Sequence, residues 1–174
     1  SSFVRPIFLR PVIQILKKIG TNPYLTDTNT LYVGMRTNSV DHLYNAILNG
    51  FNYSTLQIPI IIADGLRGEN TKTIKTEFKM LKKIKIASDI YNADGMIVIS
   101  HFKGHELSGF GGAIKNISMG CASRQGKLDM HSQNKPVIKQ SKCIACGRCI
   151  KNCQVNAIII KEKAVITNKC VGCA

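Results

Sequence analysis

An apolar run that ends in an acidic turn occupies residues 58–68 and reads IPIIIADGLRG. Such a run is typical of a strand that is covered on both faces, as the strands of parallel sheets are. The run stops at Asp64 and Gly65, two residue types that favour turns. The stretch therefore predicts a buried strand whose carboxyl end carries polar groups.

Helical and strand patterns alternate on both sides of this run. Residues 10–20 have helical apolar spacing, with a proline near the start and a glycine at the end. Asn38 and Ser39 cap a second expected helix, which Gly50 ends. Its expected inward face consists of Val40, Leu43, Tyr44, Ile47 and Leu48. Further expected elements are strands at 22–26 and 95–100, a hairpin over 72–86 and a short helix over 88–93. This alternation predicts an α/β fold, a mostly parallel sheet with flanking helices, over residues 1–132.

Three polar residues follow the three expected strands. Asp27, Asp64 and His101 recur at an interval of 37 residues, which is the cadence of strand–helix units. In open α/β sheets ligands bind outside the carboxyl ends of the strands, so these side chains are predicted to converge on one crevice. Aspartate is also an ordinary turn residue, and the alternative is that Asp27 and Asp64 only cap turns.

A segment rich in glycine and histidine, residues 104–116, follows the last expected strand and opens a helical stretch. Free backbone N–H groups at such a turn can bind an anion. The candidate cofactor-binding residues are Gly109, Gly111, Gly112 and Lys115. The alternative is that the glycines only permit tight packing of a helix on the sheet. Imidazole and thiolate groups could also hold a further metal, a question that stays open. The residues concerned are His101, His105, His131 and Cys121.

A dense cysteine pattern occupies the C-terminal part of the chain. Residues 143–153 read CIACGRCIKNC, the C-x2-C-x2-C-x3-C run that holds a [4Fe-4S] cluster in bacterial ferredoxins. A hairpin is expected over residues 158–167, and a further Cys-x2-Cys pair follows it. The predicted metal ligands are Cys143, Cys146, Cys149, Cys153, Cys170 and Cys173.

Two other uses of these cysteines fit the spacing less well. A disulfide framework needs an oxidising compartment and less regular spacing. A tetrahedral zinc site does not take three cysteines in succession at this spacing from one loop. In the two-cluster arrangement the fourth cysteine of each run ligates the other cluster, so neither cluster has four cysteine ligands within this chain. We therefore expect two [4Fe-4S] clusters in a longer parent protein, of which this chain is a fragment that binds them poorly or leaves the module disordered.

Composition and charge limit the kinds of fold and function that the chain can have. The chain has 174 residues, of which 44% are hydrophobic, so it can build a folded core. Its formal net charge is +14, and residues 134–174 hold eight Lys or Arg and one acid, Glu162. No apolar stretch is long enough to span a membrane as a helix. The polar stretch 133–142 is expected to be a linker between the α/β domain and a small α+β ferredoxin-type module, residues 143–174.

Residues 24–34, 60–68, 100–105 and 109–124, followed by the cysteine module, closely resemble the bacterial iron-sulfur proteins that carry domain of unknown function 362. The resemblance spans nearly all of the chain. It implies a [4Fe-4S] ferredoxin-type protein that is longer at both ends, and no particular reaction for the larger domain. Residues 109–115 more weakly resemble the glycine and lysine segment of the lactate racemase family, in which a nearby histidine serves a nickel cofactor. This weaker resemblance does not lead us to expect lactate racemase activity in this chain.

These patterns favour a protein that binds [4Fe-4S] clusters and transfers electrons to or from a site on the α/β domain. The alternative is a metal- or cofactor-dependent enzyme with its active site at the carboxyl ends of the strands. The candidate catalytic residues are Asp27, Asp64, His101, His105 and Lys115. Nucleic-acid binding through the basic surface is a second alternative, which the few aromatic residues and the missing recognition motif disfavour. We expect an acidic redox partner protein, an anionic small-molecule ligand, a cytoplasmic location and no membrane association.

Overall fold

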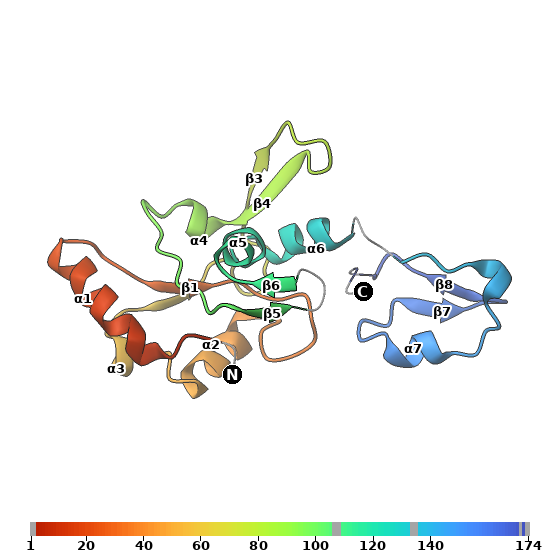
Figure 1. Ribbon diagram of the computed structural model, residues 1–174, viewed down its shortest axis with the longest axis horizontal. Helices are drawn as coiled ribbons and strands as arrows, with labels where there is room; N and C mark the ends of the chain where they lie inside the picture. Colours follow the sequence, from red (N-terminus) through yellow and green to blue (C-terminus); the bar gives the residue numbers. More distant parts are fainter. Residues whose placement is uncertain (1–2, 106–108, 133–135, 171, 173–174) are drawn as a thin grey trace.

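A computed structural model gives the fold of the chain and describes residues 3–105, 109–132, 136–170 and 172. Figure 1 shows a larger body that ends with helix α6 and a small module that contains strands β7 and β8. The helices are α1 Arg10–Lys18, α2 Ser39–Leu48, α3 Tyr53–Leu56, α4 Ser88–Tyr91, α5 Ala113–Lys115, α6 Arg124–Ser132 and α7 Arg148–Asn152. The strands are β1 Leu25–Asp27, β2 Ile60–Ile62, β3 Thr71–Lys75, β4 Lys83–Ala87, β5 Lys103–His105, β6 Gly109–Gly111, β7 Ile158–Ile160 and β8 Ala164–Ile166. The chain also forms the 3-10 helices η1 Pro6–Leu9 and η3 Gln140–Lys142 and the π-helical turn η2 Asn116–Gly120.

Strands β1 and β2 form the parallel pair that positions the polar residues of the larger body. Asp27 at the end of β1 pairs with Ile62 at the end of β2. The Ala63 N–H then donates to the Asp27 carbonyl oxygen at 3.0 Å, which continues the pairing beyond the strands. The segments that leave the two strands, residues 27–29 and 63–65, therefore lie side by side. They are called the β1–β2 edge below.

The mixture of helices and strands is as predicted, but a mostly parallel sheet is not found. Within the described residues the strands form one parallel pair and three antiparallel hairpins. The predicted strand 95–100 is absent from this set, because its residues are irregular and largely exposed, with Ile97 59% exposed. An apolar run becomes a strand only where a neighbour pairs with its backbone groups. The apolar pattern of residues 95–100 gives no information on whether such a neighbouring strand exists.

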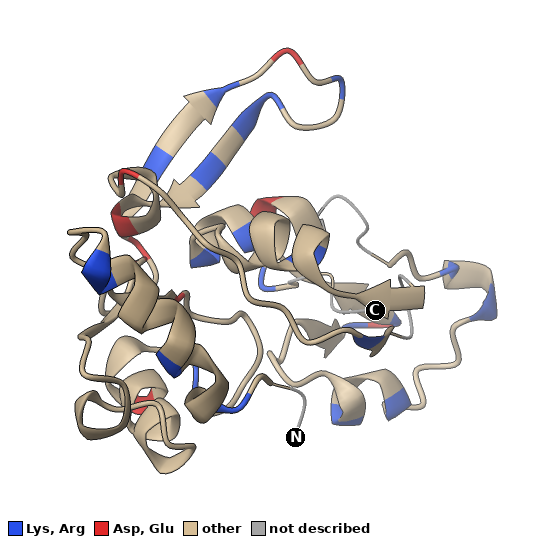
Figure 2. Cartoon of the chain, turned by 60° about the vertical axis from the view of Figure 1, so that its left-hand side comes forward, with Lys and Arg blue, Asp and Glu red and all other residues tan. Residues whose placement is uncertain are grey.

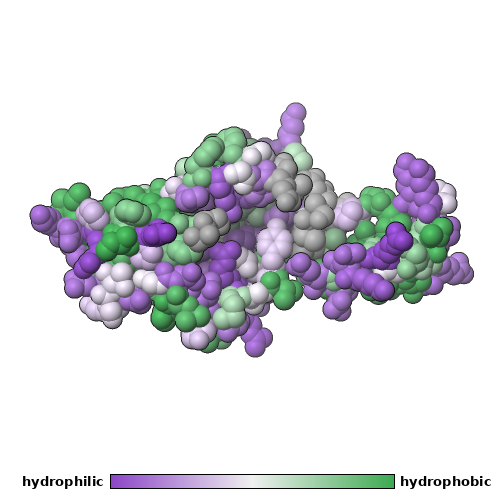
Figure 3. All heavy atoms as spheres, turned by 60° about the horizontal axis from the view of Figure 1, so that its bottom comes forward, coloured by the Kyte–Doolittle hydropathy of each residue, from purple (hydrophilic) through white to green (hydrophobic). Residues whose placement is uncertain are grey.

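The apolar core of the larger body joins η1, α1, α3 and the chain just before β2. Its cluster consists of Leu9, Ile13, Leu56 and Ile58. Helix α1 forms within the predicted range, with Pro11 in its first turn and Gly20 after its end at a φ of +84°. Many apolar side chains stay outside this core, and Figure 3 shows them on both the larger body and the module.

Helix α2 begins as predicted, but its predicted inward face is wrong. The Asn38 side chain accepts a hydrogen bond from the Asp41 N–H at 3.0 Å and so caps the helix. Val40 and Leu48, which were expected to be buried, are 64% and 65% exposed. The buried residue of α2 is His42, whose Nε2 lies 3.4 Å from Asp27 Oδ2 at the β1–β2 edge. Apolar periodicity does not register a polar contact of this kind.

Hairpins supply the remaining strand pairs. Strands β3 and β4 form the predicted hairpin, which extends away from the larger body (Figure 1). Lys residues lie along both of its strands (Figure 2). Strands β5 and β6 form a hairpin that was not predicted, within the segment rich in glycine and histidine. Strands β7 and β8 form the hairpin predicted over residues 158–167.

The described part of the chain contains no helix that is both long enough and apolar enough to cross a membrane.

Candidate functional site

The cysteine loop, residues 143–153, folds back on itself through two left-handed residues. Ala145 has a φ of 53° and Gly147 a φ of 75°. Gly147 precedes α7, the short helix that carries Cys149, and Cys153 ends this helix. A loop of this curvature turns side chains that are three residues apart toward the same side.

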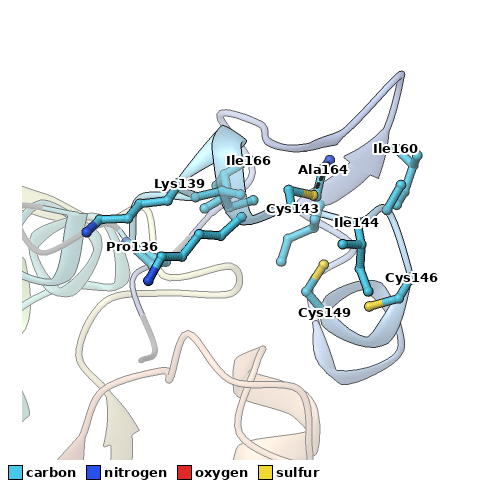
Figure 4. A pocket seen from close by; sticks show the side chains of 14 residues that line it. Pro136, Lys139, Cys143, Ile144, Cys146, Cys149, Ile160, Ala164 and Ile166 are labelled. Carbon is cyan, nitrogen blue, oxygen red and sulfur yellow. Dashed lines mark hydrogen bonds between the residues drawn. The ribbon is translucent and has the colours of Figure 1, made fainter.

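Three thiols of this loop line one cavity of about 420 Å³ (Figure 4). Cys143, Cys146 and Cys149 are called the first cysteine set below. The facing wall is apolar and comes from both strands of the adjacent hairpin. Its isoleucines are Ile158, Ile160 and Ile166. The cavity therefore combines soft sulfur donors with an apolar wall, and Cys146 and Cys149 are exposed in it.

Backbone N–H groups donate to two of the cysteine sulfur atoms. The Ala164 N–H donates to Cys143 Sγ at 3.3 Å, and the Ala157 N–H donates to Cys153 Sγ at 3.1 Å. The bonds from Ala164 and Ala145 lower the pKa of the Cys143 thiol below its usual value. Donors of this kind stabilise thiolates, which are the form that binds iron or zinc.

The second cysteine set, Cys153, Cys170 and Cys173, is described in part. Cys170 is buried, with 9% of its surface exposed, and its N–H donates to the Thr167 carbonyl oxygen at 3.1 Å. The Thr167 N–H in turn donates to the Ala157 carbonyl oxygen, at 2.7 Å, next to the N–H that binds Cys153. Cys173 lies outside the described residues. Among the residues that are described, no three His, Cys, Asp or Glu side chains are grouped tightly enough to hold a single metal ion.

The β1–β2 edge brings together Asp27 and Asp64, as predicted, but gives them different surroundings. Asp64 is fully buried, and both of its oxygens accept hydrogen bonds. Oδ1 accepts from the Asn29 N–H at 2.9 Å, and Oδ2 accepts from the Arg124 N–H at 3.0 Å. The carboxylate thus ties the chain after β1 and the start of α6 to the end of β2. This arrangement agrees with the turn-capping alternative for Asp64.

Asp27 is the carboxylate of this edge that solvent reaches, with 48% of its side chain exposed. Its Oδ2 lies 3.4 Å from His42 Nε2 and 3.5 Å from Arg36 Nη1, and its Oδ1 accepts from the Thr28 N–H at 2.7 Å. Burial of the carboxyl raises its pKa, but these hydrogen bonds and the charges of His42 and Arg36 outweigh that effect. The pKa of Asp27 is therefore lowered, which favours the carboxylate.

A buried lysine on α6 lies at the same edge and was not anticipated. Lys127 is 7% exposed, and its Nζ donates to the Ala122 carbonyl oxygen at 2.7 Å and to Thr28 Oγ1. Burial lowers the pKa of Lys127 to about 8, although the charges of Asp64 and Asp27 act in the opposite direction. A lysine in a polar stretch of sequence gives no sign of burial, because the pattern of α6 is that of a solvated helix.

Cys121 lies close enough to Asp27 and Lys127 for their charges to change the pKa of its thiol. Burial raises the pKa of its thiol, the charge of Lys127 lowers it and that of Asp27 raises it, with a net increase. Its Sγ contacts the Asn116 carbonyl oxygen at 3.5 Å. Guanidinium, amine and thiol groups, those of Arg36, Lys127 and Cys121, therefore lie next to the carboxylates of the β1–β2 edge, and groups of these kinds can bind anions or transfer protons.

The remaining candidates lie elsewhere. His101 is exposed and follows an irregular segment, so the strand that was predicted to carry it to the crevice is not found. His105 Nε2 is hydrogen-bonded to Lys115 Nζ across the β5–β6 hairpin. Burial and the charge of Lys103 lower the pKa of Lys115.

The glycines of this segment match the predicted turn before a helix only in part. Gly109 and Gly111 are the ends of strand β6, and Gly112 precedes α5, which has three residues. A helix that short presents little of the aligned dipole on which anion binding at a helix terminus depends.

The described residues form a mixed fold of helices and small sheets, with a cysteine-rich loop and hairpin in the C-terminal part. The chain matches the family described as Domain of unknown function (DUF362) over residues 1–171, and it belongs to this family. No curated protein and no solved structure matches the chain.

Proposed function

We propose that this protein binds [4Fe-4S] clusters through its cysteine module and transfers electrons to or from a site on the α/β domain. The observation that carries the proposal is the cavity that Cys143, Cys146 and Cys149 line together. When bound, such a cluster supplies one-electron transfer. The C-x2-C-x2-C-x3-C sequence spacing of residues 143–153 suits a cluster better than a tetrahedral zinc site.

The surroundings of the first cysteine set support a cluster in two ways. The N–H donors to Cys143 favour the thiolate. The isoleucines of β7 and β8 give one side of the cavity an apolar wall. Hydrogen bonds to sulfur and the degree of solvent exposure set the reduction potential of iron-sulfur centres.

We assign the second cysteine set to a second cluster, because in such runs the fourth cysteine ligates the other cluster. Each set of three then needs one further cysteine as its fourth ligand. The segment 134–174 is strongly basic, with one acid, Glu162. The redox partner is therefore an acidic protein, since complementary charge steers association.

Anaerobic reconstitution of the full-length protein with iron and sulfide tests the proposal. We expect iron and sulfide bound in equal amounts, a broad visible absorbance that bleaches on reduction, and a Mössbauer spectrum of [4Fe-4S] type. Cys146→Ser is expected to lower the bound iron. Cys121→Ser is the matched control, since it removes a cysteine outside both sets and is expected to leave the iron unchanged. Preferential binding of zinc, or equal iron in both variants, contradicts the proposal.

A second candidate function is binding of an anionic small molecule at the β1–β2 edge, as part of an enzyme site in the α/β domain. The observation that favours it is Arg36, which is half exposed and meets Asp27 at 3.5 Å while Lys127 adds a buried positive charge. A guanidinium presents five donors in a fork that suits carboxylates and phosphates.

Inorganic phosphate is a suitable probe for this second function. A ligand that binds only the folded state raises the melting temperature. Phosphate is expected to do so for the natural protein, and Arg36→Gln to reduce the shift. Arg67→Gln removes an exposed arginine from the turn after β2 and serves as the control. Equal shifts in both variants would place phosphate elsewhere and remove this candidate.

A further inference from the structure

The β3–β4 hairpin is strongly basic and extends away from the larger body. Residues 71–87 contain six lysines and one acid, Glu77, which gives a net charge of +5. The lysines lie along both strands and in the turn between them (Figures 1 and 2). Lys75 stands directly opposite Lys83, and like charges at opposed positions destabilise a hairpin. Features that act against stability in this way are typical of functional surfaces.

The base of the hairpin is fixed to the larger body by three contacts. The Ala87 N–H donates to the Cys121 carbonyl oxygen at 3.0 Å, and the Ser123 N–H donates to the Lys85 carbonyl oxygen at 3.2 Å. The Lys85 ammonium group lies 2.8 Å from Asp129 Oδ2. The outer half of the hairpin is therefore held at a defined place, with its turn directed away from the larger body (Figure 1).

The turn of the hairpin is closed by hydrogen bonds and carries exposed apolar side chains. The Thr76 N–H donates to the Lys82 carbonyl oxygen at 3.0 Å, and the Thr76 hydroxyl donates to the carbonyl oxygen of the residue before it. In the loop that these bonds close, residues 77–81, the side chains of Phe78 and Met80 are 64% and 76% exposed. The exposed lysines in and beside the loop are Lys75, Lys79, Lys82 and Lys83.

The residue types of the hairpin favour an anionic membrane over other anionic partners. Ammonium groups are attracted to an anionic lipid surface, and apolar side chains enter the boundary between headgroups and acyl chains. The grooves of nucleic acids are read mainly by arginine, asparagine and glutamine, none of which occurs in residues 71–87. Protein–protein interfaces are enriched in arginine and depleted in lysine, which is the opposite of this composition.

We propose that the β3–β4 hairpin docks the protein on an anionic lipid surface, with Phe78 and Met80 in the headgroup boundary and the lysines beside the headgroups. The expectation of no membrane association came from the lack of an apolar stretch long enough to span a membrane. Contact through the tip of a hairpin needs no such stretch. The inference is independent of the proposed function, because no cysteine and no cluster takes part in it.

Vesicle binding by tryptophan variants tests the inference. The chain has no tryptophan, so Phe78→Trp supplies a single fluorophore at the tip. With vesicles of phosphatidylserine and phosphatidylcholine in equal amounts, we expect its emission to move to shorter wavelength and to be quenched by lipids brominated in their acyl chains. Vesicles of phosphatidylcholine alone should have little effect. Phe8→Trp is the matched control, because Phe8 lies in η1 and is 67% exposed, and its emission should stay unchanged.

A pair of lysine variants tests the contribution of charge. Lys79→Gln combined with Lys82→Gln is expected to weaken vesicle binding about 30-fold, since each lysine near an anionic membrane contributes about fivefold. Lys18→Gln combined with Lys161→Gln removes the same charge from exposed positions outside the hairpin and should weaken binding much less. Co-sedimentation with the same vesicles over a range of lipid concentrations measures the affinity.

Several results would overturn the inference. Equal losses in the two lysine pairs would show that the protein adsorbs through its whole basic surface. A change of emission in Phe8→Trp but not in Phe78→Trp would place the contact away from the hairpin. A Phe78→Trp emission that responds to double-stranded DNA or to polyglutamate, and not to the vesicles, would identify a nucleic acid or an acidic protein as the partner.

Discussion

Gly126 permits the close approach of helix α6 to strand β4. A Cβ at this position would lie 2.2 Å from the Lys85 carbonyl oxygen. Gly126→Ala is expected to lower the free energy of unfolding by about 1–3 kcal/mol, because backbone atoms must move to admit the methyl group. Denaturant unfolding measures this change. Gly95→Ala, at a site where nothing lies within 4 Å, is expected to have little effect, and equal losses in both variants would contradict the packing explanation.

Lys127 makes the free energy of unfolding depend on pH in the alkaline range. Burial lowers the pKa of Lys127 to about 8 from an ordinary value of 10.5. Between these values the unfolded chain binds more protons than the folded chain, so the free energy of unfolding rises with pH. The rise is on the order of 3 kcal/mol and is expected to be lost in Lys127→Met.

Urea unfolding at several pH values across this window measures the effect. Lys18→Met, at the exposed end of α1, is the control and should keep the natural profile. A natural profile in Lys127→Met would show that the amine is solvated in the folded protein.

The role of Lys127 illustrates which site residues sequence patterns can identify. Asp27 and Asp64 could be predicted because strand ends in α/β folds place such residues at one edge. Lys127 and His42 could not, because each is a polar residue on a helix whose buried contact comes from a distant segment. Arg36 likewise gains its importance only from the position of Asp27.

The β3–β4 hairpin contains an unfavourable pair that can be corrected. Lys75 stands directly opposite Lys83 in its register. Like charges at opposed positions destabilise a hairpin, and opposite charges stabilise it by about 0.2–1 kcal/mol. Lys75→Glu is therefore expected to raise the melting temperature at low salt. Lys79→Glu makes the same change of charge in the turn, outside the ladder, and should not reproduce the gain.

Elements whose signals are local could be predicted, and elements that depend on a distant neighbour could not. The cap of α2, the β3–β4 hairpin and the β7–β8 hairpin follow from adjacent residues. The run 95–100 has the composition of a buried strand and yet forms none, because a strand also requires a partner in space. The exposure of the apolar face of α2 has the same cause, because the contact that orients this helix, that of His42 with Asp27, comes from a distant segment.

The net charge of +14 has a kinetic consequence for the molecule as a whole. An anionic reductant such as dithionite is attracted by a positive protein, and salt screens the attraction with a Debye length of about 10 Å at 0.1 M. For the cluster-loaded protein, rising ionic strength is expected to slow reduction by dithionite in stopped-flow measurements. Reduced methyl viologen, a cation, should show the opposite trend. Rates independent of salt would show that the site of electron entry does not experience this charge.

The carboxylate of Asp64 joins segments that are 35 and 60 residues distant in the chain. Because closing such long loops is costly, we expect these contacts to form late in folding. Interactions that are absent from the transition state affect the rate of unfolding more than the rate of folding. Asp64→Asn should therefore unfold faster and refold at a nearly unchanged rate. The buried side chain of Asp64 thus contributes to the kinetic stability of the native state.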